Sequence, residues 1–164
     1  MWDGTLRGMD TETRATKALD ASELTFTVVR TDRPGDASES AALQGIRLDQ
    51  LLRTIVVRRR DGDYVFVLVP GGRQIDWPKL RAHLGVHRVS LPDAEEAKAA
   101  TGYERGAITP LGSTTAWPVV ADATIGGRGT VAIGGGARDV NIHAAAADLL
   151  ASLGAVSAEV TKPQ

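Results

Sequence analysis

The chain has 164 residues and a formal net charge of −1 at pH 7. This length fits one domain, and this charge excludes a polycation drawn to nucleic acid by its overall field. Cysteine is absent, which excludes disulfides, thiolate nucleophiles and cysteine metal sites and suits a reducing, cytoplasmic compartment. No apolar run reaches the roughly 18 residues of a membrane-spanning helix, and residues 1–9 do not resemble a secretory signal. We expect a loose N-terminal extension over 1–9 and one domain over 10–164.

Helical and extended patterns alternate along the chain. Helical patterns cover residues 10–19, 38–43, 48–52, 77–84, 92–100 and 142–153. Strand patterns cover residues 24–29, 54–60, 64–69, 86–91, 119–123, 129–133 and 155–160. Asp61-Gly62 between two β-rich runs predicts a hairpin. Because several strands are joined by short turns, a mixed α+β sheet is favoured over a purely parallel one.

Capping residues define where the helices should begin. Asp10 or Thr11 is expected to cap the first helix, Ser38 the second, Asp76 the helix before Gly85, and Asn141 the last. Residues 134–137 are expected to form a glycine turn that leads into this last helix.

Residues 101–112 (Thr-Gly-Tyr-Glu-Arg-Gly-Ala-Ile-Thr-Pro-Leu-Gly) are the segment on which the functional prediction rests. Three glycines, one proline and two threonines fall within twelve residues. Glycine lets a ligand approach the main chain closely, whereas Pro110 fixes its own φ and favours an extended Thr109. We expect a shaped loop whose N–H groups could hold an anion, or a carbonyl oxygen that becomes one.

The glycine-rich stretch 126–136 leaves two interpretations open. Gly127-x-Gly129 runs into a strand, so it lacks the context of a dinucleotide site. The cluster 134–136 could place a phosphate or carboxylate at a helix N-terminus beside Arg138. A plain tight turn explains the same residues equally well.

Two histidines and the serines give little sign of other chemistry. His83 and His87 have the i, i+4 spacing of a helical metal pair. However, Gly85 lies between them and no third ligand is evident, so two surface histidines are favoured. The sequence contains no Gly-x-Ser-x-Gly motif, which is the usual anchor of a serine-hydrolase triad.

The arginines of the hairpin also leave alternatives open. Arg58, Arg59 and Arg60 end a strand, where a solvated edge that resists aggregation is favoured over a phosphate-contacting patch. Arg53 precedes the aliphatic run 55–57. Such a cation is either held by a partner or ligand or extends to solvent from the strand end.

Several segments, taken in order, resemble one family. They are Leu-Leu-Arg-Thr-Ile-Val-Val (51–57), the hairpin strand 64–69, Gln74-Ile75-Asp76-x-x-Lys79-Leu80, Ala97-x-x-x-Thr101-Gly102-Tyr103-x-x-Gly106-x-Ile108-x-Pro110-Leu111-Gly112, and Gly134-Gly135-Gly136-x-Arg138. This ordered set is similar to the YbaK and prolyl-tRNA-synthetase-associated (ProX-like) editing domains. The match covers nearly the whole chain, and its most specific part is the Thr-Gly to Pro-Leu-Gly stretch.

The resemblance implies both a fold and an activity. The expected fold is α+β (mixed α/β), with a curved, mostly antiparallel sheet flanked by helices. The expected activity is that of a free-standing deacylase in translation fidelity. It would hydrolyse the ester between a small wrong amino acid, such as Ala, Cys or Ser, and a proline-type tRNA. The expected partners are the acceptor end of the tRNA and, transiently, a synthetase, with no membrane, cofactor or metal.

Two departures from the family pattern affect the expected site. Family members typically carry lysine where this chain has Arg53. Arginine stays protonated and cannot act as a base, so Arg53 could hold a terminal phosphate or the ester carbonyl but could not remove a proton. Relatives often have aspartate where this chain has Asn141, so a negative charge is lost there.

The expected reaction needs no covalent nucleophile, because an aminoacyl ester is already activated. The site must place a water and stabilise an oxyanion, for which one donor is worth roughly 3–4 kcal/mol. The catalytic residues predicted on this basis are Arg53, Thr54, Gly106 and Ala107, with backbone N–H groups around 106–108 as oxyanion donors. The predicted substrate-binding residues are Phe26, Ile108, Thr109, Pro110, Gly135, Arg138 and Asn141.

Two other functions stay open at this point. A module that lacks the family lysine could bind charged tRNA or an aminoacyl-adenosine without turnover. A hydrolase of small free aminoacyl esters would instead show little dependence on tRNA or salt.

Overall fold

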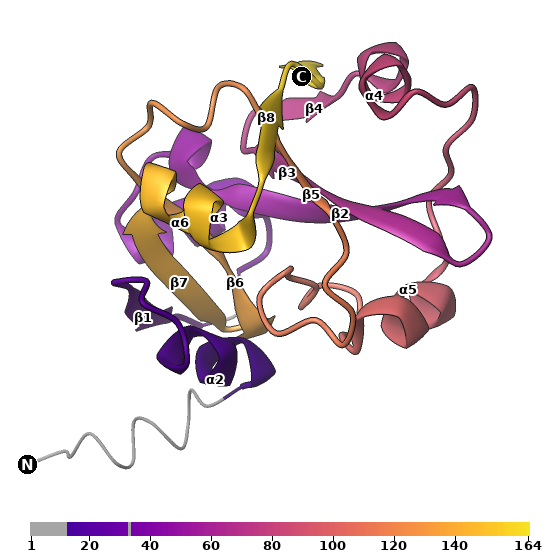
Figure 1. Ribbon diagram of the computed structural model, residues 1–164. Helices are drawn as coiled ribbons and strands as arrows, with labels where there is room; N and C mark the ends of the chain where they lie inside the picture. The colour runs from indigo at the N-terminus through magenta and orange to yellow at the C-terminus, as the bar shows by residue number, and fades with distance from the viewer. Residues whose placement is uncertain (1–12, 33) are drawn as a thin grey trace, which may run out of the picture.

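The computed structural model describes residues 13–32 and 34–164 (Figure 1). The expected extension over 1–9 and the predicted caps Asp10 and Thr11 lie outside these residues. The first described helix is α2 (Arg14–Asp20), and its cap is Thr13, whose hydroxyl accepts a hydrogen bond from the Thr16 N–H. Within residues 13–32 and 34–164, no helix has both the length and the apolar character needed to cross a membrane.

Short helices and strands follow one another along the described chain. The other helices are α3 (Ala37–Gln44), the 3-10 helix η1 (Leu48–Gln50), α4 (Trp77–Leu84), α5 (Ala94–Thr101) and α6 (Ala146–Leu153). The strands are β1 (Thr27–Arg30), β2 (Leu52–Arg60), β3 (Asp63–Pro70), β4 (Arg73–Ile75), β5 (Val119–Asp122), β6 (Thr130–Ala137), β7 (Val140–Ala145), β8 (Val156–Ala158) and β9 (Thr161–Pro163).

The strands form three sheets, where the sequence suggested one. Their orders are β1-β7-β6, β2-β3-β5-β8 and β4-β9. The β3–β5 and β5–β8 pairs are parallel, and the other four pairs are antiparallel. The predicted mixed α+β class and the prevalence of antiparallel pairing are therefore confirmed. An isolated parallel bridge between Leu51 and Ala132 links the two larger sheets.

The β2–β3 hairpin runs through the middle of the molecule, and each face of β3 contributes to a different core (Figure 1). Phe66 and Leu68 pack into the larger core, together with residues of β6, β7 and α6. Val65 and Val67 pack into the second core, together with Leu80 of α4. Successive strand residues point to opposite faces, so burial on both faces explains why this strand is almost entirely hydrophobic.

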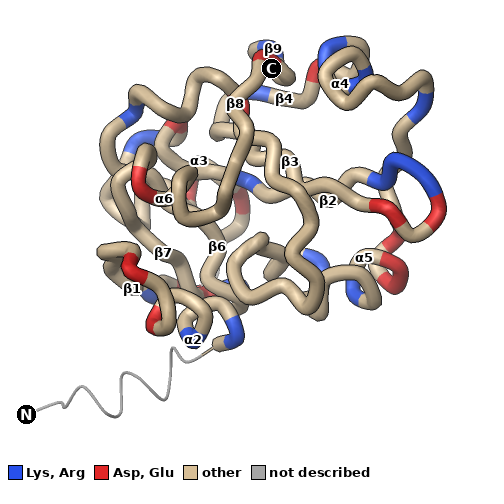
Figure 2. The backbone as a smooth tube through the Cα atoms, viewed as in Figure 1, with Lys and Arg blue, Asp and Glu red and all other residues tan. Residues whose placement is uncertain are grey.

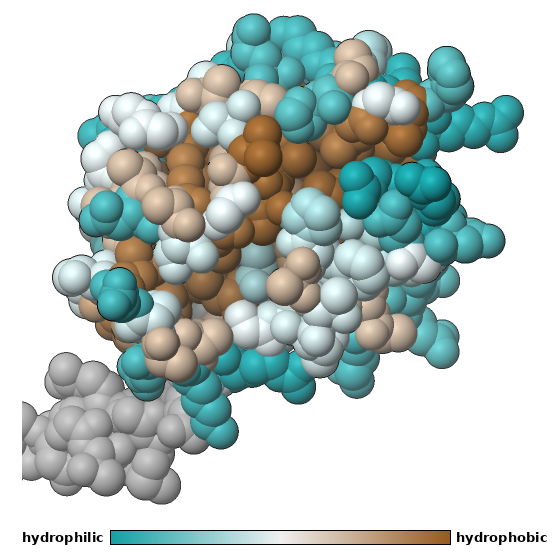
Figure 3. Space-filling view, in the orientation of Figure 1, coloured by the Kyte–Doolittle hydropathy of each residue, from teal (hydrophilic) through white to brown (hydrophobic). Residues whose placement is uncertain are grey.

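The edge strand β8 leaves part of the surface apolar. It is the last strand of the order β2-β3-β5-β8, and its Val156 is 55% exposed. Figure 3 shows hydrophobic residues visible across this face of the molecule.

The last third of the chain corrects several expectations. Residues 134–137 belong to β6 and do not form a turn, and Asn141 lies in β7 and does not cap a helix. The last helix therefore begins at Ala146 and not at residue 142. A Cβ added to Gly135 would lie 2.6 Å from Cγ1 of Val140. Glycine is needed here because β6 and β7 approach closely next to their turn at 138–139, a few residues after the turn that the sequence predicted.

Two smaller corrections concern a cap and a strand. Asp36, and not Ser38, caps α3 by accepting a hydrogen bond from the Glu39 N–H. Residues 86–91 form no strand; Ser90 makes only an isolated bridge with Arg58. The predicted Asp76 cap of α4 and the Asp61-Gly62 hairpin are confirmed.

Candidate functional site

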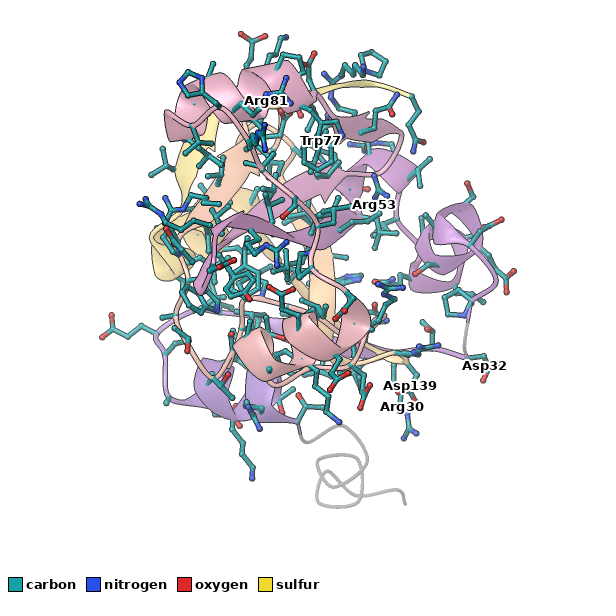
Figure 4. All side chains as sticks on the ribbon, turned by 90° about the vertical axis from the view of Figure 1, so that its right-hand side faces the viewer. Arg30, Asp32, Arg53, Trp77, Arg81 and Asp139 are labelled. Carbon is teal, nitrogen blue, oxygen red and sulfur yellow. The ribbon has the colours of Figure 1, made fainter. Side chains whose placement is uncertain are left out.

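A cavity of ≈520 Å³ lies where four parts of the chain meet. Its walls come from the start of β2, the loop after α5, the β6–β7 hairpin and the beginning of α3. The lining residues are Pro34, Asp36, Ala37, Ser40, Leu51, Leu52, Arg53, Thr54, Arg105, Gly106, Ala107, Ile108, Gly134, Ala137, Arg138, Val140 and Asn141. Figure 4 shows Arg53 on the side of the β ribbon that faces α3. The structure thus brings Arg53 and the glycine loop to one cavity, as the sequence predicted.

The loop wall is held in shape at its tip and at its base. At the tip, Arg138 Nη2 donates to the Arg105 carbonyl over 2.8 Å. At the base, the Tyr103 hydroxyl donates to the Leu111 carbonyl over 2.6 Å. Between them Gly106 has φ +93°, and a Cβ added there would lie 2.9 Å from Arg138 Nε. This position favours glycine both for its backbone angle and for its space.

The backbone N–H groups of this loop are not equivalent. The Ala107 N–H donates to the Glu104 carbonyl over 3.0 Å, so it is not free to donate to a ligand, which corrects the expectation for Ala107. Within the described chain, the N–H groups of Gly106 and Ile108 donate to no other protein group. Among residues 106–108, the candidates for an oxyanion donor are therefore the N–H groups of Gly106 and Ile108.

The half-buried Arg53 is a cation with no ion-pair partner among the residues that the structure describes. Its Nη2 donates to the Arg73 carbonyl over 2.8 Å, and it forms no ion pair with any carboxylate of the described residues. Arg53 also lines a smaller cavity of ≈220 Å³ with Gly71, Gly72 and Gln164. The Arg53 guanidinium carries several N–H donors. One hydrogen bond to a neutral carbonyl therefore fixes its position without neutralising its charge.

Two polar residues complete the floor of the cavity. The Thr54 hydroxyl is buried and makes no hydrogen bond to another described residue. Asn141 donates from Nδ2 to the Val29 carbonyl over 3.2 Å, which fixes its side chain against β1. Among the described lining residues, Asp36 is the only carboxylate, and it is engaged as the cap of α3.

The cavity therefore has a positive character. Arg53, Arg105 and Arg138 line it against the single carboxylate of Asp36. Such a balance attracts anionic groups such as phosphates. Arg105 is not among the predicted site residues, although its place beside Gly106 in the loop was a signal that it could reach the site.

Four predicted binding residues lie away from the cavity wall. Phe26 packs against the larger core. Thr109 is completely buried, and the Gly135 carbonyl accepts a hydrogen bond from the Thr13 hydroxyl. Pro110 lines a separate ≈260 Å³ hollow beside α2 and α6. In place of the predicted wall of Phe26 and Pro110, the apolar lining comes from Leu51, Leu52, Ala137 and Val140.

The other patterns noted in the sequence have structural roles. Arg58 pairs with Glu96 at 2.8 Å, and Arg59 and Arg60 pair with Asp63 at 2.8 and 3.1 Å. The hydrogen bond from Arg59 lowers the pKa of Asp63 below its ordinary value. Figure 2 shows basic and acidic residues together at the β2–β3 turn, with acidic residues of α5 nearby. The described residues contain no group of three or more His, Asp or Glu side chains that could hold a metal ion.

The fold and the cavity define a class of protein: a mixed α+β domain with a positively charged hollow beside a constrained glycine–proline loop. The model of the aminoacyl-tRNA editing domain matches residues 34–151. The chain belongs to this family, and the YbaK-type resemblance inferred from the sequence is confirmed.

Known proteins of two kinds are similar to this chain. The "Proline--tRNA ligase" of Thermosipho africanus is 29% identical over 120 residues, which cover 73% of this chain and 21% of the ligase. The chain thus spans about a fifth of that relative's length. The "Putative Cys-tRNA(Pro)/Cys-tRNA(Cys) deacylase EbsC" of Enterococcus faecalis is 25% identical, and the match covers 76% of each protein.

A solved structure gives the same fold. The crystal structure of "a putative trans-editing enzyme for prolyl tRNA synthetase" has a TM-score of 0.85 to this chain. The alignment covers 99% of both chains at 24% identity.

Proposed function

We propose that this protein is an aminoacyl-tRNA deacylase that removes a small amino acid, such as Ala, Cys or Ser, from a mischarged proline-type tRNA. The observation that carries the proposal is the meeting of Arg53 with the 106–108 loop around one cavity. A fixed cation and free backbone N–H groups are the parts that ester hydrolysis at a tRNA end requires. The family supports the reaction type, and the relatives support the choice of tRNA.

The reaction proceeds by attack of water on the ester. Water adds to the carbonyl carbon, and the carbonyl oxygen becomes an oxyanion next to the N–H groups of Gly106 and Ile108. The bond from the carbonyl carbon to the ribose oxygen then breaks. The ribose oxygen takes up a proton, which leaves a free amino acid and a tRNA with a free 3′ end.

The protein contributes position and charge and does not act as a proton acceptor. The lining residues include no histidine, and their one carboxylate caps α3. Arg53 is permanently protonated, so the proton is carried by water or by a ribose hydroxyl of the substrate. Preorganised donors of this kind are worth about 3–4 kcal/mol each when they face a developing oxyanion.

The partners follow from this reaction. The three arginines of the cavity contact the phosphates at the acceptor end of the tRNA, and the enzyme acts in the cytoplasm in transient association with a synthetase. A substrate of this charge predicts that the affinity falls steeply with salt. Hydrolysis of free aminoacyl esters would lack this dependence.

The direct test is release of amino acid from a panel of charged tRNAs. We expect the purified protein to deacylate Ala-, Cys- or Ser-tRNA(Pro) and to leave Pro-tRNA(Pro) intact. If no aminoacyl-tRNA of a full panel is hydrolysed faster than in buffer, the enzymatic proposal fails. Binding of a non-hydrolysable aminoacyl-adenosine analogue by the same samples would then support the binding-module alternative.

The binding module stays a second candidate function because this chain has Arg53 where family members typically have lysine. Arg53→Lys distinguishes the two functions. A large gain of hydrolysis would identify the present chain as a binding module, whereas an unchanged or reduced rate supports an enzyme that works with arginine.

A further inference from the structure

We infer that Asp122 and Thr161 are positioning residues for Arg53, acting through Arg73. The inference rests on the proposed function only in giving Arg53 a role in hydrolysis. The contacts that carry it lie outside the cavity, on β4, β5 and β9.

The first step is the dependence of Arg53 on β4. The only hydrogen bond of its guanidinium to a described residue goes to the Arg73 carbonyl, over 2.8 Å. The orientation of Arg53 is therefore set by where the main chain of Arg73 lies. This bond uses one N–H of the fork, so the remaining N–H groups stay available to a ligand.

The second step is the weakness of β4 as a support. β4 and β9 have three residues each and form a sheet of two strands. A two-stranded ribbon of this size is only marginally stable by itself. The anchor of Arg53 must therefore be held by additional contacts.

The Arg73 side chain supplies these contacts. Its Nε donates to the Thr161 hydroxyl over 2.7 Å, and its Nη2 donates to the Thr161 carbonyl over 3.3 Å. Its Nε also lies 3.9 Å from Oδ2 of Asp122. One guanidinium thus connects the main chain beneath Arg53 to β9 and to the end of β5.

Asp122 is the fixed point of this network. It is 1% exposed and accepts hydrogen bonds from the Val160 N–H over 3.2 Å and from the Thr124 N–H over 3.1 Å. A buried carboxylate with several donors is held firmly, because each donor that is lost leaves its charge less well compensated. The positive charge of Arg53 at the cavity is therefore positioned by a carboxylate that never contacts the substrate.

The experiment compares Thr161→Val and Asp122→Asn with the control Gln74→Ala. Gln74 lies next to Arg73 in β4, but the hydrogen bond of its side chain goes to the Pro163 carbonyl, over 3.4 Å, and not to Arg73, Thr161 or Asp122. The readouts are the kinetics of tRNA deacylation and the order of the Arg53 Nε–H bond, measured by 15N relaxation. The Arg53 signal is assigned by its loss in Arg53→Gln.

We expect kcat/KM to fall on the order of tenfold in both test variants, less than the roughly hundredfold that a 1 Å misplacement can cost. The loss should appear in the same parameter, kcat or KM, that Arg53→Gln changes. In an Arg53→Gln background Thr161→Val should cause no further loss. Gln74→Ala should leave the kinetics unchanged, and Thr161→Ser, which keeps the hydroxyl, should restore them.

The relaxation measurement separates this inference from the proposed function. If no charged tRNA is hydrolysed, a loss of order at Arg53 in Thr161→Val still supports the relay, and the proposed function alone fails. If Arg53 stays as ordered in Thr161→Val as in Gln74→Ala, the relay is overturned, whatever the activity. Asp122→Asn is a buried change that can unfold the protein, and in that case Thr161→Val decides.

Discussion

The two ends of strand β2 carry arginines in opposite electrostatic situations. At the turn end Arg58, Arg59 and Arg60 each pair with a carboxylate of Glu96 or Asp63. At the other end Arg53 bonds to the neutral carbonyl of Arg73. The same residue type thus stabilises the fold where its charge is neutralised and is free to act on a ligand where it is not. Counting arginines along the strand would not separate the two roles.

The strongest test of this contrast removes one arginine from each end. We expect Arg53→Gln to lower kcat/KM for tRNA deacylation by about a hundredfold, in line with the loss of one charged donor near the reacting group. Arg60→Gln should leave the rate unchanged, because this exposed side chain pairs with Asp63 and does not line the cavity. Equal losses in both variants would show that the arginines act only through the general charge of the surface.

The glycine loop offers a second and smaller test. Gly106→Ala places a side chain at φ +93°, 2.9 Å from Arg138 Nε. We expect about a tenfold loss of activity and a destabilisation of about 1–2 kcal/mol, since left-handed backbone is strained for alanine. The matched control is Gly126→Ala, which meets no neighbour within 4 Å and should change neither quantity. Deacylation kinetics and urea denaturation measure the two effects.

The paired end of β2 should respond in stability alone. Glu96 accepts hydrogen bonds from Arg58 Nη1 and from the Tyr64 hydroxyl, and the bond from Tyr64 raises the pKa of that phenol. Glu96→Gln weakens both contacts, and we expect a loss of about 1–2 kcal/mol in the free energy of unfolding. Deacylation should stay at the wild-type rate. A drop in activity without a drop in stability would contradict the assignment of this end to structure.

The smallest expected effect is a pH dependence of stability outside the cavity. Burial lowers the pKa of His143 below its ordinary value of 6.5, and its Nε2 lies 2.9 Å from Oε1 of Gln44. The unfolded chain therefore binds this proton more readily than the folded one, so stability falls as pH drops below 6.5. Urea denaturation at several pH values below 6.5 should show that the free energy of unfolding falls less steeply with decreasing pH in His143→Gln than in the wild type. The same dependence in both proteins would mean that other groups cause the loss of stability.

Local signals in the sequence were sufficient for much of the fold. The Asp61-Gly62 hairpin and the Asp76 cap of α4 each depend on a few consecutive residues, and both were found. The glycine loop and Arg53 were correctly brought to one cavity because a resemblance supplied the long-range relation between them.

The parts that the sequence did not predict depend on contacts that residue type alone does not specify. β9, at the end of the chain, pairs with β4, and Gly135 is required by the approach of Val140 within the β6–β7 hairpin. The hydrogen bond that occupies the Ala107 N–H is local, but its presence depends on the exact turn geometry and not on residue type. For these reasons Phe26 and Pro110 were predicted to bind the substrate, whereas Leu51 and Val140 contribute to the apolar lining of the cavity.

The glycine–proline segment has a different neighbour on each side. Its residues 106–108 face the arginine-lined cavity, whereas Pro110, Leu111 and Gly112 face the apolar hollow of ≈260 Å³ next to α2 and α6. A larger side chain in that hollow would press on peptide units directly next to residues 106–108. Under the proposed function, natural variation in α2 and α6 is thus a route by which evolution could tune the rate of hydrolysis without altering any residue that lines the arginine-rich cavity.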